Sequence, residues 1–156
     1  MLIRPAGPDD ADAIADLYTA ARIAAVPFMP SALHTNAEDR AWFAARLVDG
    51  EHEAWVATPA DDDEVLGFAL ITPTWLDGLY VAPAHKSQGI GSALLDLVKS
   101  LRPDGFGLWV FESNTPARGF YARHGLAEVE RTDGAENEEQ APDIRMVWPA
   151  EAPRRP

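Results

Sequence analysis

The chain of 156 residues contains no cysteine, and this absence removes several kinds of chemistry at once. Structural disulfides, zinc–thiolate sites, iron–sulfur clusters and a thiol nucleophile all require cysteine. Long apolar runs are missing as well, since no stretch approaches the roughly 20 residues of a membrane helix. The first residues lack the apolar core of a secretory signal. We therefore expect a cytoplasmic protein that has no membrane partner.

Basic residues are also scarce. Lys and Arg number 13 against 25 Asp and Glu, which gives a formal net charge of −12. Nucleic acids are excluded as partners, because phosphate backbones are bound by clustered Lys and Arg. An acidic surface favours cationic partners instead. The 47% of hydrophobic residues is enough for one core, so we expect a single domain over residues 1–149 and a flexible tail over residues 150–156.

Apolar periodicity predicts the order of strands and helices. Strands are expected over residues 2–5, 53–58, 65–72, 75–81, 106–111, 127–132 and 143–148. Helices are expected from residue 9 onward and over residues 38–48, 90–101 and 115–124, the last with Thr115 as its N-cap. Hairpin strands followed by helical crossovers indicate an α/β (α+β) fold, with helices on the faces of a mixed sheet.

The most informative segment is the loop between the strand that ends at Val81 and the helix that follows. It carries Gly89 and Gly91, whose missing side chains let the backbone approach a pyrophosphate closely. The start of the helix offers unpaired N–H groups and partial positive charge, which bind phosphate oxygens. His85 and Lys86 add positive charge in an otherwise acidic chain. The loop is therefore a predicted anion site.

Two other nucleotide-binding loops fit this segment less well. The dinucleotide fingerprint would need glycine where Leu94 stands, and too little chain follows to complete a doubly wound sheet. The P-loop ends in Gly-Lys-Ser/Thr, which is absent here. A Rossmann-like nucleotide binder is kept as the weaker alternative.

Two motifs resemble the GNAT superfamily of acyl-CoA transferases. The first is that family's Arg/Gln-x-x-Gly-x-Gly/Ala loop after a Val-x-Pro turn, written here with lysine first as Val81-Ala82-Pro83 and Lys86-Ser87-Gln88-Gly89-Ile90-Gly91. The second is its strand-end asparagine and helical tyrosine, here Asn114 and Phe120-Tyr121 before His124-Gly125-Leu126. The resemblance covers about residues 75–127. It implies a mostly antiparallel sheet of about seven strands flanked by about four helices.

The resemblance also implies an N-acetyltransferase that uses acetyl-CoA as co-substrate and needs no metal. Main-chain groups along one strand would bind the pantetheine arm, loop amides the pyrophosphate, and an asparagine the amide arm. The residues at these positions are Leu79, Tyr80 and Val81, then Lys86, Gln88, Gly89, Gly91 and Ser92, and Asn114. Arg118 is a further candidate for a phosphate contact, against the reading of a solvated arginine.

For the chemistry, Tyr121 is predicted to donate a proton to the departing thiolate, against the alternative of a core tyrosine. Asp77 and Glu112 are candidates for the base that deprotonates the amine, and a water chain is a third alternative. Asp77 is preferred, because two-residue alternation predicts that it shares a strand face with Leu79 and Val81.

The acceptor is predicted to be a small cationic primary amine, bound between residues 26–35 and residues 133–143. The second segment holds Glu136, Glu138 and Glu139, which could receive an ammonium group, against the alternative of a solvated hairpin turn. No metal site is expected, because His34, His52 and His124 have no ligand spacing with one another or with the acids. A non-catalytic acyl-CoA-binding module is the main rival function, and a homodimer is left open.

Overall fold

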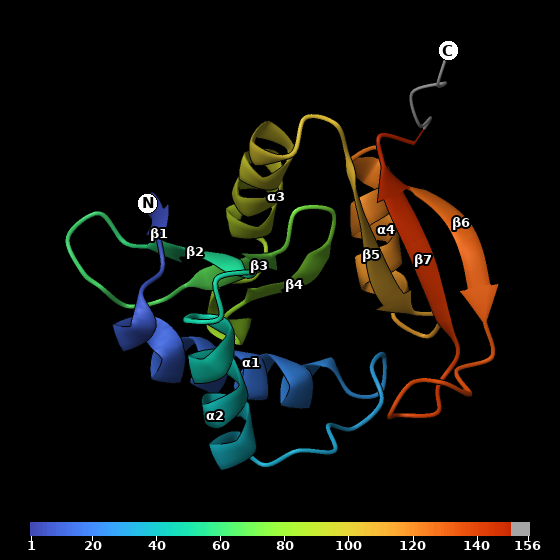
Figure 1. Cartoon of the computed structure of the whole chain (residues 1–156), viewed down its shortest axis with the longest axis horizontal. Helices are drawn as coiled ribbons and strands as arrows, with labels where there is room; N and C mark the ends of the chain where they lie inside the picture. The colour runs from blue at the N-terminus through green and yellow to red at the C-terminus, as the bar shows by residue number, and fades with distance from the viewer. Residues whose placement is uncertain (151–156) are drawn as a thin grey trace.

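Seven strands form two antiparallel sheets in the computed structural model, which describes residues 1–150 (Figure 1). One sheet holds β1 (Leu2–Pro5), β2 (Glu53–Thr58), β3 (Gly67–Ile71) and β4 (Leu76–Val81), paired in that order. The other holds β5 (Phe106–Phe111), β6 (Ala127–Thr132) and β7 (Asp143–Trp148), with β7 in the middle. The tail predicted over residues 150–156 falls, from residue 151 on, outside the described residues.

Residues 1–150 also form four α-helices, in the predicted order. α1 (Ala11–Ala25) and α2 (Asn36–Arg46) cover one face of the larger sheet, and α3 (Ile90–Leu101) covers the other. α4 (Thr115–Arg123) packs with the smaller sheet in the same core as α3. The predicted fold class is confirmed. None of the helices within this part of the chain is long and apolar enough to cross a membrane.

The helix α3 approaches the larger sheet closely because β3 begins with glycine. A β-carbon at Gly67 would lie 2.9 Å from Cγ2 of Ile90 and 3.2 Å from Cδ1 of Leu94. Ile90, Leu94 and Leu95 are buried in this contact. Burial of each such side chain stabilises the fold by roughly 1.5–3 kcal/mol. The packing fixes the position of the loop that precedes α3.

The two sheets meet at one end and separate between β4 and β5. A parallel bridge joins Trp75 to Gly107, and the Gly107 N–H donates to the carbonyl of Thr74 at 3.0 Å. A β-carbon at Gly107 would lie 2.9 Å from the Trp75 ring, so this approach requires glycine. Beyond the bridge the two strands diverge (Figure 1). The single sheet expected from the sequence is therefore divided into two.

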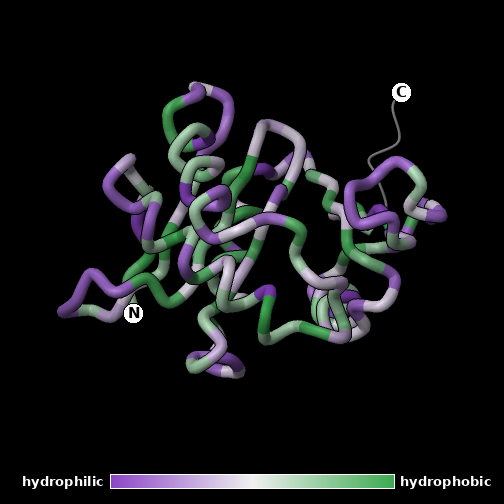
Figure 2. The backbone as a smooth tube through the Cα atoms, turned by 90° about the horizontal axis from the view of Figure 1, so that it is seen from below, coloured by the Kyte–Doolittle hydropathy of each residue, from purple (hydrophilic) through white to green (hydrophobic). Residues whose placement is uncertain are grey.

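The connection between α1 and α2 reaches from the larger sheet to the smaller one. The Ser113 hydroxyl donates to the Phe28 carbonyl at 2.6 Å, and His34 Nε2 lies 2.7 Å from Glu138 Oε2. Figure 2 shows that hydrophilic residues gather on the outer loops, whereas the central strands are hydrophobic. The connection thus spans the opening between the two sheets.

Candidate active site

The loop before α3 contains two residues with left-handed backbone, Ser87 at φ 64° and Gly89 at φ 81°. Gly89 is the N-cap of α3 and supplies no side-chain cap, so the first N–H groups of the helix remain available to a ligand. A β-carbon at Gly89 would meet nothing within 4 Å, whereas one at Gly91 would lie 3.4 Å from the Phe120 ring. Gly89 therefore faces open space, whereas a β-carbon at Gly91 would make an ordinary van der Waals contact with α4.

A cavity of about 440 Å³ lies against this loop. Among the described residues that line it there is no carboxylate, while His85, Lys86 and Arg123 bring basic groups. The lining is therefore basic although the chain has a net charge of −12. All the predicted cofactor residues except Gln88 line the cavity, namely Leu79, Tyr80, Val81, Lys86, Gly89, Gly91, Ser92 and Asn114.

Two side chains of the loop region already have protein partners. Gln88 Oε1 lies 3.3 Å from Nδ1 of His85. Ser92 Oγ lies 3.1 Å from Nε2 of His124, at the end of α4. These contacts engage the side-chain oxygens of both residues, and the backbone N–H groups at the start of α3 stay available to an anion.

Asn114 is the N-cap of α4, so the cap predicted at Thr115 is wrong by one residue. The Asn114 side-chain oxygen accepts from the backbone N–H of Ala117 at 3.4 Å. Asparagine and threonine both favour this position, and the sequence does not rank two adjacent candidates. The side-chain NH₂ group of Asn114 has no partner among residues 1–150, so it remains available to a ligand in the cavity.

Tyr121 projects from α4 into the core and is 9% exposed. It lines the 440 Å³ cavity and also a neighbouring cavity of about 180 Å³. Burial raises the pKa of its hydroxyl, which therefore stays protonated at ordinary pH. Tyr121 thus packs in the core, as the alternative of a core tyrosine predicted. Its hydroxyl is also a potential proton donor in both cavities.

Asp77 lies at a β-bulge, which overturns the alternation predicted for it. The register between β3 and β4 shifts at this point and leaves Asp77 without a partner across the strands. Asp77 lines the cavity on the α1–α2 side of the sheet together with Tyr80, whereas Leu79 and Val81 pack with the core under α3. Asp77 also lines the 180 Å³ cavity, to which α4 contributes Tyr121.

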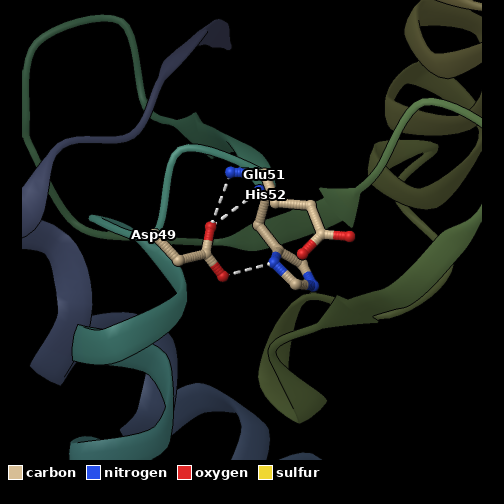
Figure 3. Close-up of side chains that lie close together, drawn as sticks. All are labelled: Asp49, Glu51 and His52. Atoms are coloured by element: carbon tan, nitrogen blue, oxygen red, sulfur yellow. Dashed lines mark hydrogen bonds and ion pairs between the residues drawn. The ribbon is translucent and has the colours of Figure 1, made fainter.

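His52 lies next to Asp77. Figure 3 shows that His52 is held by Asp49. His52 Nδ1 lies 2.7 Å from Asp49 Oδ2, and its Nε2 lies 3.6 Å from Asp77 Oδ2. Partial burial raises the pKa of Asp77, and the charge of His52 opposes that shift. His52 thus lies between the carboxylates of Asp49 and Asp77.

The same turn brings Asp49, Glu51 and His52 together, with potential ligand atoms within 4.8 Å of one another (Figure 3). The expectation that the histidines have no ligand spacing with the acids is therefore wrong for His52. Asp49 also accepts the backbone N–H groups of Glu51 and His52 at 2.8 and 2.9 Å, which lowers its pKa to about 2. These hydrogen bonds account for the grouping as a turn that orients His52.

The other two polar candidates are paired away from the cavities. Arg118 Nε lies 2.8 Å from Glu128 Oε2, so its guanidinium is engaged by the smaller sheet. Glu112 lies 3.6 Å from Arg131 and lines none of the three cavities described in this section. This arrangement favours Asp77 over Glu112 as a base.

A larger cavity of about 760 Å³ lies on the α1–α2 side of β4. Aromatic rings and carboxylates line it together: Tyr18, Trp42, Phe43, Phe68 and Tyr80, with Glu38, Asp39, Asp77 and Glu138. Of the three glutamates predicted for the acceptor, Glu138 lines this cavity and Glu136 and Glu139 do not. His34 links Glu138 at 2.7 Å to Glu38 at 3.6 Å.

These three cavities follow β4 and share lining residues. Leu79, Asn114 and Tyr121 line both the 440 Å³ and the 180 Å³ cavities. Asp77 and Tyr80 line both the 180 Å³ and the 760 Å³ cavities. An anion site, a buried phenol, a carboxylate and an acidic aromatic cavity are thus arranged along one strand.

The model of the acetyltransferase (GNAT) family matches residues 12–126 of the chain. The chain belongs to the GNAT family. It is 34% identical over 99 residues to peptidyl-lysine N-acetyltransferase YjaB of Salmonella typhimurium. These residues make up 64% of this chain and 67% of that protein. It is 32% identical over 107 residues, or 59% of each chain, to phosphinothricin N-acetyltransferase of Streptomyces coelicolor.

The fold of this GNAT protein also matches solved members of the family. A GCN5-related N-acetyltransferase from Rhodopseudomonas palustris has a TM-score of 0.77 at 25% identity, over 94% of this chain and 93% of that one. Together with the family match, these relatives make the chain an N-acetyltransferase. The predicted resemblance and the predicted class of enzyme are confirmed.

Several site residues of this GNAT chain escaped the sequence analysis. Tyr18, Trp42 and Phe43 lie on α1 and α2 and line the 760 Å³ cavity, and Arg22 lines the 180 Å³ cavity. Aromatic residues at helical spacing predict core packing as readily as a binding wall. Trp42, which is 44% exposed, is a large apolar residue that a core alone does not account for.

Proposed function

We propose that this GNAT protein transfers an acetyl group from acetyl-CoA to the primary amine of a small acceptor that carries positive charge. The change of charge along β4 supports the proposal. The 440 Å³ cavity is lined by Lys86 and Arg123 and by no described carboxylate, whereas the 760 Å³ cavity is lined by Glu38, Asp77 and Glu138. An anionic donor and a cationic acceptor would each meet the complementary end.

The residues of the 440 Å³ cavity fit coenzyme A. Open space at Gly89 and the uncapped start of α3 would hold the pyrophosphate, with Lys86 and Arg123 nearby. β4 is the edge of its sheet, so main-chain groups of Leu79, Tyr80 and Val81 remain for the amides of the pantetheine arm. The side-chain NH₂ group of Asn114 is a further donor to that arm.

Two side chains of the 180 Å³ cavity would move the protons. Acetyl-CoA supplies an acetyl thioester, whose carbon–sulfur bond breaks as the acceptor nitrogen bonds to the carbonyl carbon. The Asp77 carboxylate would take up the proton that the acceptor's ammonium group loses, with His52 next to it. The Tyr121 hydroxyl, kept protonated by burial, would donate its proton to the sulfur, and the second proton that the nitrogen loses as the amide forms would restore that hydroxyl.

The shape of the acceptor cavity favours a small molecule. Its volume of about 760 Å³ falls within the range of about 300–1,000 Å³ that is usual for small-ligand sites. One relative is named for peptidyl-lysine and the other for phosphinothricin, so the relatives do not decide the size of the acceptor. The connection that carries His34, bonded to Glu138, spans the opening between the sheets and favours an enclosed acceptor.

The rival function is an acyl-CoA-binding module without catalysis. Tyr121 and Asp77 line one cavity from two different elements, which supports catalysis. A turnover assay with acetyl-CoA and a library of primary amines, read by thiol release and by mass spectrometry of the product, tests the proposal. We expect turnover with small cationic amines. Tight binding of acetyl-CoA without thiol release for any amine would instead support the binding module.

A further inference from the structure

Arg22 is a buried arginine for which the described residues provide no counter-ion. It lies near the end of α1 and is 7% exposed. One terminal nitrogen donates to the Tyr18 hydroxyl at 2.7 Å, and the other donates to the Pro30 carbonyl at 3.1 Å. Its Nε is buried without a partner. The guanidinium therefore has two neutral acceptors for five N–H groups.

Burying a charge with only neutral partners is costly. An ionised group loses its hydration in the interior, and hydrogen bonds to neutral oxygens replace only part of it. A ligand that brings a negative charge to Arg22 would remove this cost.

Arg22 lies where the reaction is proposed to occur. It lines the 180 Å³ cavity together with Tyr121 and Asp77. The carboxylates that line this cavity have other partners, because Asp77 pairs with His52 at 3.6 Å and Asp143 bonds to Thr132 and Asn137. An anion that enters the cavity would therefore have little competition for Arg22.

We propose that Arg22 binds a carboxylate that the acceptor carries next to its reacting amine. A volume of about 180 Å³ holds roughly six groups of the size of water, at about 30 Å³ each. This is room for an amine, the carbon that bears it and a carboxylate. A carboxylate can accept two parallel N–H bonds from a guanidinium, and the unpartnered Nε offers one of them.

The proposal rests on the proposed function and narrows the acceptor within it. The rest of the acceptor would extend into the 760 Å³ cavity, where Glu38 and Glu138 meet its distal positive charge. The acceptor class is then an α-amino acid with a cationic side chain. A simple diamine or polyamine would leave Arg22 unpaired.

Two probes that differ only in this carboxylate test the proposal. L-arginine and agmatine share the reacting amine and the distal guanidinium, and agmatine lacks the carboxylate. We expect calorimetry and kcat/KM to favour L-arginine in the wild type. In Arg22→Gln that preference should fall by at least about tenfold, as expected when one partner of a buried charge pair is removed. Comparing the ratio of the two probes cancels the different basicity of their amines.

Arg46→Gln is the matched control, since Arg46 lines the 760 Å³ cavity but not the smaller one. It should leave the ratio of the two probes unchanged. Equal affinity of the wild type for the two probes overturns the proposal without any variant, even if Arg22→Gln does not fold. An equal fall of kcat for both probes in Arg22→Gln also overturns it, because Arg22 would then act on the acetyl transfer. Absence of thiol release with every amine contradicts the proposed function instead.

Discussion

The three cavities form a groove along β4, with the 440 Å³ cavity at its donor end and the 760 Å³ cavity at its acceptor end. The two ends are built in different ways. The donor end combines the loop and helix start from His85 to Ser92 with residues of α1, β4 and α4. The acceptor end is assembled from α1, α2, β3, β4 and the loop before β7. The basic groups at the donor end have no carboxylate beside them in its cavity, while the acids at the acceptor end are bonded to neighbours such as His34 and Thr19. The glycine loop of the donor end is thus local in sequence, whereas the acidic wall of the acceptor end depends on packing between distant elements.

The largest effect is expected where the two ends meet, at Tyr121. The change Tyr121→Phe keeps the ring in the core and removes the proton. Loss of a general acid costs about 10²–10⁴ in rate, so kcat should fall by that factor while the KM of acetyl-CoA stays nearly constant. Steady-state kinetics with thiol detection measure both constants. Wild-type turnover would leave Tyr121 with its packing role alone.

A smaller loss is expected for the base. Partial burial raises the pKa of Asp77, and a base acts in its deprotonated form. The pH–rate profile should therefore have a rising limb, which reflects the loss of the Asp77 proton and lies above the usual carboxyl range. Activity should be lost as pH falls through this limb. Asp77→Asn should lower kcat by about 10² and remove this limb from the pH–rate profile. Glu112→Gln is the control, because Glu112 pairs with Arg131 outside the groove. A limb that disappears in the Glu112 variant would assign the base to Glu112.

The contrast between Gly89 and Asp77 explains how much of the site could be predicted. The phosphate binding proposed at Gly89 depends on adjacent residues and on the start of one helix, and both are visible in the sequence. The face on which Asp77 lies depends on a bulge, where one extra residue interrupts the alternation of β4. The sequence contains no signal for that extra residue, although β4 itself was predicted almost to its bounds.

The acceptor end shows the same limit more strongly. The fold follows from periodic patterns, which are local, so its order of elements was predicted. The role of Arg22 depends on its burial beside Tyr18 and Pro30, and that of Glu138 depends on its contact with His34 across 104 residues. Such contacts are set by packing between distant elements. Equally acidic neighbours such as Glu136 cannot be told apart from Glu138 by sequence.

The donor end can be tested by a matched pair of glycines. Gly89 and Gly50 both have left-handed backbone, at φ 81° and 75°, and a β-carbon at either would meet no described atom within 4 Å. Alanine at each position should carry a similar backbone strain of roughly 1 kcal/mol. Only Gly89→Ala should weaken acetyl-CoA binding, by roughly tenfold, which is about the value of one hydrogen bond to a charged group. Calorimetry measures both variants, and equal losses of affinity would refute the loop assignment.

The smallest effect is expected at the acceptor end, where Glu138 is 65% exposed and its attraction for an ammonium group is screened by water and salt. Glu138→Gln should raise the KM of a cationic acceptor by about two- to fivefold and leave that of acetyl-CoA unchanged. Glu136→Gln removes the same charge outside the cavity and serves as the control. An equal rise of KM in both variants would assign the effect to the overall charge of the protein.

The pH dependence of that effect distinguishes the contact further. Glu138, and to a smaller degree Glu38, raises the pKa of His34, so the ion pair with His34 is present at low pH and is lost as pH rises through the raised value. Protonated His34 competes with the acceptor for the Glu138 carboxylate. The difference in acceptor KM between wild type and Glu138→Gln should therefore grow as pH rises, and His34→Gln should make it constant. A difference that shrinks with rising pH would show that the His34 pair helps to form the acceptor site.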